Sequence, residues 1–304
     1  MYELFFAPLV MASAFRLMVP VLFIAMGGCF GQKGRVLNIG LESFTAFSAF
    51  FAMLGSYIYQ NPWMGLLFGV MSSTVASCKF AHFVLYFNSA PVVVGIALNL
   101  AGWGGTTFLL SMIFKTRGVF IDPRIKSFQS INIPVLKDIP YIGRVLSGQN
   151  ILVYVCLLVV VLSYIVMYKT PFGLRLRGVG IKKVAAQTVG VNATKYQFIA
   201  ILIGGILSGF GGSFLTIGGA SMFTENMSAG KGFLAVAAIM VGDGNPLKTA
   251  LACFIFGYTN AISVSLQSIG LPSQIVISVP YLFTILFMLI SAIAAKMRLK
   301  KAVA

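Results

Sequence analysis

The sequence predicts an all-α, polytopic membrane protein with about nine transmembrane helices, eight to ten in all, and with broken or re-entrant segments in each half. Of its 304 residues, 59% are hydrophobic and only 9% are charged, whereas a soluble domain carries about 25% charged residues. Apolar runs close to the roughly 20 residues that span a bilayer recur along the chain. Short alternating segments typical of a β-barrel are absent, so helices are the expected spanning elements.

Nine apolar runs give the expected helices in chain order. Asn and Pro residues separate the second run from the third, at 60–62, and the third from the fourth, at 88–91, because these residues favour turns and helix starts. The seventh run is the shortest. We treat residues 1–304 as a single transmembrane domain whose runs are 6–30, 37–59, 63–87, 92–114, 151–168, 198–217, 233–241, 249–267 and 275–295.

The net charge of +16 reflects Lys and Arg residues at the ends of the apolar runs. They form no patch interleaved with aromatic residues, so we expect anchoring in the membrane and no nucleic-acid binding. One side of the nine-helix arrangement collects twice as many Lys and Arg as the other, and the richer side should be cytoplasmic. This places the basic loop 169–195 and the C-terminus in the cytoplasm and the interval 115–150 outside. The side of the N-terminus stays open.

Two glycine-rich, polar segments interrupt the apolar pattern, residues 31–43 and 211–233. Each carries an Asn and a Glu, and they fall in opposite halves of the chain. Non-helical backbone at membrane depth is tolerated where it faces protein or a water-filled cavity, and paired interruptions indicate a substrate pathway in transporters. The candidate pathway residues for a polar solute are Asn38, Glu42, Asn99, Phe223, Glu225 and Asn226.

Each of these candidates also has a structural interpretation. Glu42 could stabilise a helix start, where negative charge contributes about 0.3–1 kcal/mol. Asn99 lies in an otherwise apolar run and could join two helices by a hydrogen bond. Phe223 could simply pack in the core.

The chain lacks the residues for chemistry of its own. Its four cysteines are scattered through apolar runs and are expected to be core residues, not disulfides or metal ligands. Gly230 and Lys231 lack the rest of a phosphate-binding G-x-x-x-x-G-K-[ST] motif. We therefore expect no catalytic residue, no metal site and no cofactor here, with ATP and Mg²⁺, if used, on another chain. Only six acidic residues are present, too few for an evident proton relay.

Four motifs in order resemble a known family. They are GRVLNIGLES at 34–43, TPFGLRLRGVG at 170–180, FTENMSAGKGFLAVAAIMVGDGNP at 223–246 and VPYL at 279–282. The sequence resembles permease subunits of bacterial ABC importers of the branched-chain amino acid/ribose type. It is most similar to the shorter permease of nucleoside importers.

The resemblance implies a multi-pass permease domain of the bacterial cytoplasmic (inner) membrane that imports nucleosides. It implies as partners a homologous second permease, a cytoplasmic ABC ATPase, an extracytoplasmic nucleoside-binding lipoprotein and membrane lipid. Simple sugars or branched-chain amino acids are alternative substrates, and a self-sufficient secondary carrier is the alternative from another class.

The resemblance also makes 169–195 the loop that couples to the ATPase. Residues 181–189 have the composition of a short helix that stops at a glycine. The pair Lys182-Lys183 departs from the family pattern, which leaves the charge of the docking partner open. The implied coupling residues are Gly173, Arg175, Arg177, Gly180, Ala185, Ala186 and Gly190.

Overall fold

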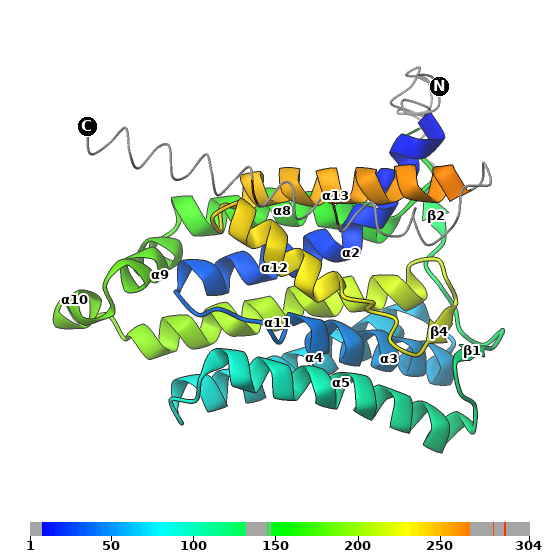
Figure 1. The fold of residues 1–304 in the computed structure, drawn as a ribbon, viewed down its shortest axis with the longest axis horizontal. Helices are drawn as coiled ribbons and strands as arrows, with labels where there is room; N and C mark the ends of the chain where they lie inside the picture. The colour runs from blue at the N-terminus through cyan, green and yellow to red at the C-terminus, as the bar shows by residue number, and fades with distance from the viewer. Residues whose placement is uncertain (1–7, 132–144, 146, 268–281, 283–288, 290–304) are drawn as a thin grey trace.

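A computed structural model describes residues 8–131, 145, 147–267, 282 and 289 of the chain. These residues form a helical bundle whose long axis is horizontal in Figure 1. Its helices are α2 (Pro8–Lys33), α3 (Leu41–Tyr59), α4 (Pro62–Leu85), α5 (Pro91–Phe114), α8 (Ile151–Lys169), α9 (Pro171–Ile181), α10 (Lys183–Thr188), α11 (Ala193–Ile217), α12 (Lys231–Val241) and α13 (Pro246–Gln267). Its short strands are β1 (Val119–Ile121), β2 (Ser130–Ile131), β3 (Gln149–Asn150) and β4 (Met222–Thr224).

The expected polytopic helical fold is confirmed, but the expected number of about nine spans is not supported. Among the described residues, seven helices are long and apolar enough to cross a membrane. The seventh expected run is α12, which has only 11 residues and rises about 16 Å, roughly half of a 30 Å hydrocarbon core. The ninth expected run, 275–295, lies outside the described residues.

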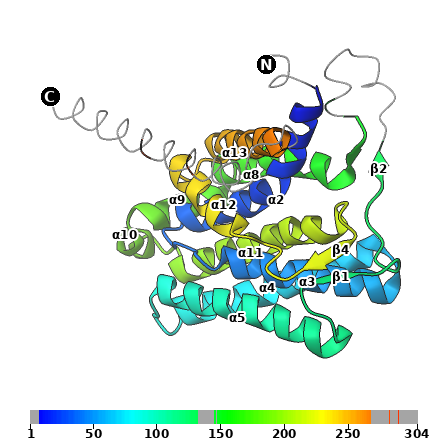
Figure 2. The ribbon, with the colours of Figure 1, turned by 45° about the vertical axis from the view of Figure 1, so that its right-hand side comes forward.

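The helices stack in layers. In Figures 1 and 2, α8 and α13 lie on one side of the bundle and α5 on the opposite side. Helix α11 lies between them and packs on α2, α3 and α4. We call the end of the bundle that holds the C-terminal end of α2, α9, α10 and the start of α11 the basic end. The opposite end, which holds β1 and β4, is the strand end.

Local sequence signals explain where the helices begin. The Asn61 side chain accepts a hydrogen bond from the Trp63 N–H, and Pro62 occupies the first turn, where its missing N–H costs nothing. Asn150 and Asn192 cap α8 and α11 in the same way. The predicted turn at 60–62 is therefore confirmed.

The two interruptions are narrower than the sequence indicated. Helix α2 continues to Lys33 and α3 begins at Leu41, so only residues 34–40 are non-helical in the first. Residues 211–217 belong to α11, so the second comprises 218–230. The glycines at 211 and 212 lie within α11 and do not end it. They lie where α2 and α3 approach α11 closely.

Small residues bring α11 into contact with α3 and α4. The Ser48 hydroxyl of α3 donates to the Gly209 carbonyl at 2.5 Å, and the Ser73 hydroxyl of α4 donates to the Gly205 carbonyl at 2.6 Å. A Cβ added at Gly212 would collide with the Thr45 carbonyl oxygen of α3. Such small-residue contacts with interhelical hydrogen bonds are typical of helix packing in lipid.

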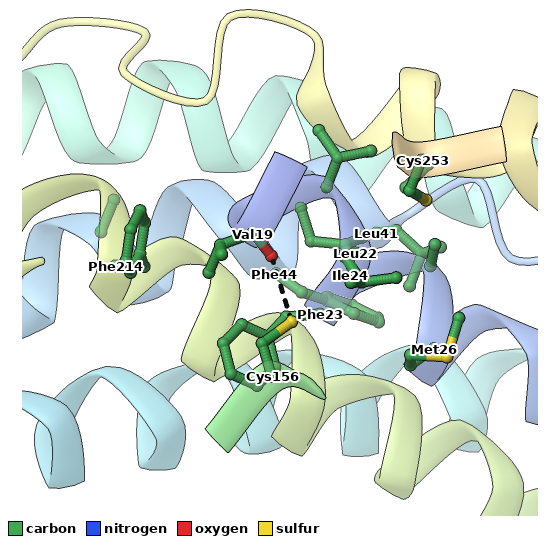
Figure 3. Close-up of a cluster of buried hydrophobic side chains, with 14 of the residues drawn as sticks. Val19, Leu22, Phe23, Ile24, Met26, Leu41, Phe44, Cys156, Phe214 and Cys253 are labelled. Atoms are coloured by element: carbon green, nitrogen blue, oxygen red, sulfur yellow. Dashed lines mark hydrogen bonds between the residues drawn. The ribbon is translucent and has the colours of Figure 1, made fainter. Parts of the chain in front are cut away.

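The hydrophobic core surrounds α2. Figure 3 shows Phe23, Ile24 and their neighbours packed against Cys156 of α8, whose thiol lies 3.8 Å from the Val19 carbonyl oxygen. Cys29, Cys156 and Cys253 are buried, as expected for core residues, whereas Cys78 is exposed.

We predict that Gly212→Ala destabilises the bundle, because the new methyl group meets the backbone of α3 and overpacking costs about 1–3 kcal/mol. The melting temperature of the full-length protein in detergent measures this effect. The control is Gly104→Ala on α5, where an added Cβ meets nothing within 4 Å. Equal melting temperatures for the two variants would contradict the described packing.

Candidate functional site

The two interruptions meet at the side chain of Glu42. One carboxylate oxygen accepts the Gly230 N–H at 2.9 Å, and the other accepts the Gly232 N–H at 2.6 Å. Glu42 is completely buried in the first turn of α3. The N-terminus of a helix carries unpaired N–H groups and a partial positive charge. The carboxylate therefore caps α12 from another helix, and these charge-assisted bonds join the two halves of the chain.

The absence of a side chain at Gly232 makes this contact possible. A Cβ at that position would lie 2.5 Å from the Cα and the nitrogen of Glu42. Gly230, which precedes α12, has a φ of +77°, a conformation that glycine adopts without strain.

The contact is separated from the basic end by the length of α12. Helix α12 runs from it to the basic end, where Asp243 lies 3.4 Å from Lys33. The 11 residues of α12 rise about 16 Å over that distance. Residues 34–40 and 218–230, which meet at Glu42, are therefore non-helical among helices long enough to cross a membrane, where backbone must face protein or water.

Two asparagines hold the first interruption. The Asn38 side-chain oxygen accepts the Gly40 N–H at 3.0 Å. On α5, the Asn99 oxygen accepts the Ser43 N–H at 3.0 Å, and its amide donates to the Ile39 carbonyl at 3.2 Å. The interhelical hydrogen bonds expected of Asn99 are therefore present, and Asn38, Glu42 and Asn99 form one buried cluster.

The second interruption is held at the strand end. Strand β4 pairs with β1 in antiparallel register, and Phe223 packs edge-on against Phe50 at 5.4 Å. Glu225 exchanges two hydrogen bonds with Gly118, one through its N–H at 2.8 Å and one through its carboxylate at 2.9 Å. Asn226 is exposed and has a φ of +55°. These three residues therefore lie away from the Glu42 cluster.

Two cationic side chains that are not among the candidate pathway residues line a cavity at the strand end. Arg16 of α2 and Lys231 of α12 face a space of about 510 Å³ between α2, the end of α11 and the residues Phe128, Ser130, Gly148 and Asn150. Lys231 also lines a neighbouring space of about 200 Å³ with Asn260 of α13. The sequence contained a signal for both residues, because a basic residue within an apolar segment is itself a candidate functional residue.

The expected coupling loop contains two helices. The predicted short helix is present as α10, which is followed by Gly190 with a φ of +83°. The residues before it, expected to be loop, form α9. Thr170 caps α9 by accepting the Gly173 N–H, and Lys182 separates the two helices. Of the two predicted alanines, Ala186 is buried and Ala185 is exposed.

Helix α9 is fixed to α2 and α11. A Cβ at Gly180 would collide with the Lys33 carbonyl oxygen, so α9 lies directly on the end of α2. The Arg175 guanidinium donates to the Tyr196 hydroxyl at 2.8 Å, and this bond raises the pKa of Arg175. Arg177 lies over the Tyr168 ring at 4.8 Å. The guanidinium groups therefore connect α9 to helices on both sides.

We predict that Glu42→Gln lowers the melting temperature of the full-length protein. Two backbone N–H groups need two acceptor atoms, and an amide offers only one, so a buried hydrogen bond worth about 1.5–3 kcal/mol is lost. Glu225→Gln is the matched control, because the single bond from Gly118 needs only one oxygen. If both variants melted alike, the bidentate contact would be wrong.

Comparison with known proteins gives a family. The family described as "Branched-chain amino acid transport system / permease component" matches residues 10–295. The nucleoside ABC transporter permease protein NupC of Lactococcus lactis is 31% identical over 91% of this chain and 90% of its own length. The guanosine ABC transporter permease protein NupQ of Bacillus subtilis is 31% identical over 88% and 86%.

One further relative is less similar to this chain. The putative glucose ABC transporter permease protein TsgC13 of Haloferax volcanii is 25% identical over 83% of this chain and 75% of its own length. No solved structure matches the chain. The family match spans nearly the whole sequence, including both interruptions and the α9–α10 segment. The chain therefore belongs to the family of branched-chain amino acid transport system permease components.

Proposed function

We propose that this chain is the transmembrane permease subunit of an ATP-driven ABC importer that carries nucleosides into a bacterial cell across its cytoplasmic membrane. The observation that carries the proposal is the similarity to two permeases named for nucleosides and guanosine over 88–91% of the chain. The two non-helical segments joined near the middle of the bilayer support it, since such segments occur where a polar solute crosses.

The basic end of the bundle is the cytoplasmic end in this proposal. It holds α9, α10, Lys33 and Arg35, and an excess of Lys and Arg marks the cytoplasmic side of membrane proteins. The segment 169–195 and the C-terminus would then lie inside the cell. The interval 115–150 would lie outside and receive the solute from an extracytoplasmic binding lipoprotein.

The solute would enter beside the second interruption. The cavity of about 510 Å³ at the strand end has a volume in the range of small-molecule sites. Lys231 lines both this cavity and the smaller space beside α12. The predicted pathway residues divide between two levels. Phe223, Glu225 and Asn226 lie at the strand end but outside the lining of this cavity, whereas Asn38, Glu42 and Asn99 would position the backbone near the middle of the membrane.

Helices α9 and α10 would receive the motion of the ATPase. Because Gly180 lies on the end of α2, a rigid displacement of α9 displaces the start of residues 34–40 as well. Gln197 of α11 also donates to the Gly34 carbonyl at 2.9 Å. Movement at the basic end would therefore reach Glu42 through seven residues of backbone, and α12 through its two hydrogen bonds.

The proposal requires partner chains. ATP and Mg²⁺ would bind to a separate ATPase, and a second permease would complete the pathway. Pairing is supported by the relatives, since NupB of Lactococcus lactis and NupP of Bacillus subtilis also match this chain, at 20% and 26% identity. The similarity to a putative glucose permease makes import of simple sugars the second candidate function.

We predict ATP-dependent nucleoside uptake by proteoliposomes that contain the assembled importer, and none by liposomes that contain this chain alone. Unlabelled guanosine, uridine, glucose and leucine serve as competitors against a labelled nucleoside. ATP-dependent uptake of labelled glucose without uptake of the labelled nucleoside would assign the chain to sugar import. Uptake by the isolated chain without ATP would instead indicate a secondary carrier.

We also predict that Arg175→Glu combined with Arg177→Glu prevents association with the ATPase while membrane insertion stays normal. The substitutions reverse the charge of α9 and remove its contacts with Tyr196 and Tyr168. Co-purification of the ATPase measures the effect. Lys115→Glu combined with Arg117→Glu, two exposed residues outside the coupling segment, is the control with the same change of charge. An unchanged yield of complex for the double variant would overturn the coupling assignment.

A further inference from the structure

Helices α4 and α5 lie on the side of the bundle opposite α13 (Figures 1 and 2). A groove runs between these two helices. It has a volume of about 490 Å³ and also takes part of its wall from α3. The described residues that line it are apolar except for Ser72 and Lys79. Among the described contacts, α4 packs chiefly on α3 and α11, and α5 packs chiefly on α3, so α4 and α5 leave this space between them.

No described segment covers the groove. Met71 and Val75, which form its α4 wall, are 58% and 56% exposed. Both belong to a helix long and apolar enough to cross a membrane. Within the hydrocarbon of a membrane, an apolar groove binds either an acyl chain or a helix of another protein, since water has no favourable partners there.

The groove lies along the middle part of α4, and Lys79 marks its end nearer the basic end. Its lining on α4 extends from Phe68 to Lys79, which corresponds to about 16 Å along a helix axis. Half of a hydrocarbon core of roughly 30 Å is about 15 Å. Phe68 and Lys79 each lie six residues from an end of α4, so an acyl chain that starts near Lys79 would follow the groove to the middle of the bilayer and beyond it.

The charge at one end of the groove identifies the leaflet and the headgroup. Lys79 lies less than two turns before α4 ends at the basic end, where Tyr86 contacts Phe198 of α11. A lysine at this position extends its ammonium group toward the headgroups. Among the described residues, the ion pairs are Lys33–Asp243 and Arg124–Asp122, so Lys79 has no carboxylate partner there. His82 lies one turn further along the same exposed face.

We propose that this groove binds an anionic phospholipid, with one acyl chain between α4 and α5 and the phosphate at Lys79. The leaflet is the one at the basic end, which the proposed orientation makes cytoplasmic. A helix of a second permease is the competing occupant. It would bury the Lys79 ammonium group against apolar surface at a large desolvation cost, whereas a phosphate satisfies it.

The exposed thiol of Cys78 provides a probe beside Lys79, because Cys29, Cys156 and Cys253 are buried. The full-length protein, labelled at Cys78 with a bimane, is reconstituted into bilayers that contain brominated lipids as quenchers. We expect brominated phosphatidylglycerol to quench at about one fifth of the mole fraction that brominated phosphatidylcholine needs. One basic residue at an anionic membrane surface contributes a factor of about five.

Three variants decide the outcome. Lys79→Gln is expected to abolish the preference for phosphatidylglycerol, and the matched control Lys248→Gln on α13 is expected to retain it. Ala101→Phe, which fills the groove from α5, is expected to reduce quenching by both lipids. Equal quenching by the two lipids in the wild type, or an unchanged preference in Lys79→Gln, would overturn the proposal. So would a bimane that no lipid quenches in the assembled importer, because a partner chain would then cover the groove.

Discussion

The arrangement depends on one buried carboxylate with two backbone partners. An ionised side chain in hydrocarbon costs several kcal/mol unless it is fully paired, and Glu42 is paired only because Gly230 and Gly232 offer their N–H groups at the start of α12. That helix start in turn carries unpaired donors and a partial positive charge at membrane depth. The Glu42 carboxylate therefore satisfies the N–H groups at the start of α12, and these N–H groups stabilise the carboxylate. This mutual pairing holds the two interruptions together.

Helix α12 is held at both ends by one stretch of the first half of the chain. Glu42 binds its first turn, and Lys33 lies 3.4 Å from Asp243 just beyond its last. The exposed pair contributes little to stability, but it places the end of α2 beside the end of α12. Since α9 lies on that same end of α2, the basic end, the first interruption and α12 form one connected unit through which a displacement can pass.

The sequence predicted the helical class and the place of nearly every described helix, because apolar runs and Asn-Pro turns are local signals. It did not predict how the interruptions pair. Glu42 and Gly232 are 190 positions apart, and no spacing rule relates a carboxylate to a distant helix N-terminus. The extent of the second interruption was overestimated because glycines within α11 look like helix breakers in sequence, whereas in the bundle they allow close contact with α3. Helix α9 was not predicted, because Gly178 and Gly180 also look like helix breakers in sequence.

In the proposed importer, the junction at Glu42 would lie on the path of the solute, and its exposure would change when ATP is used. The most direct measurement is the accessibility of Ala229→Cys, beside Gly230 in the cavity of about 200 Å³, in a Cys78→Ser background. A membrane-impermeant thiol reagent is applied to the assembled importer before and after ATP is trapped with vanadate. We predict that the labelling rate changes severalfold between the two states. An identical rate in both states, with transport intact, would contradict it.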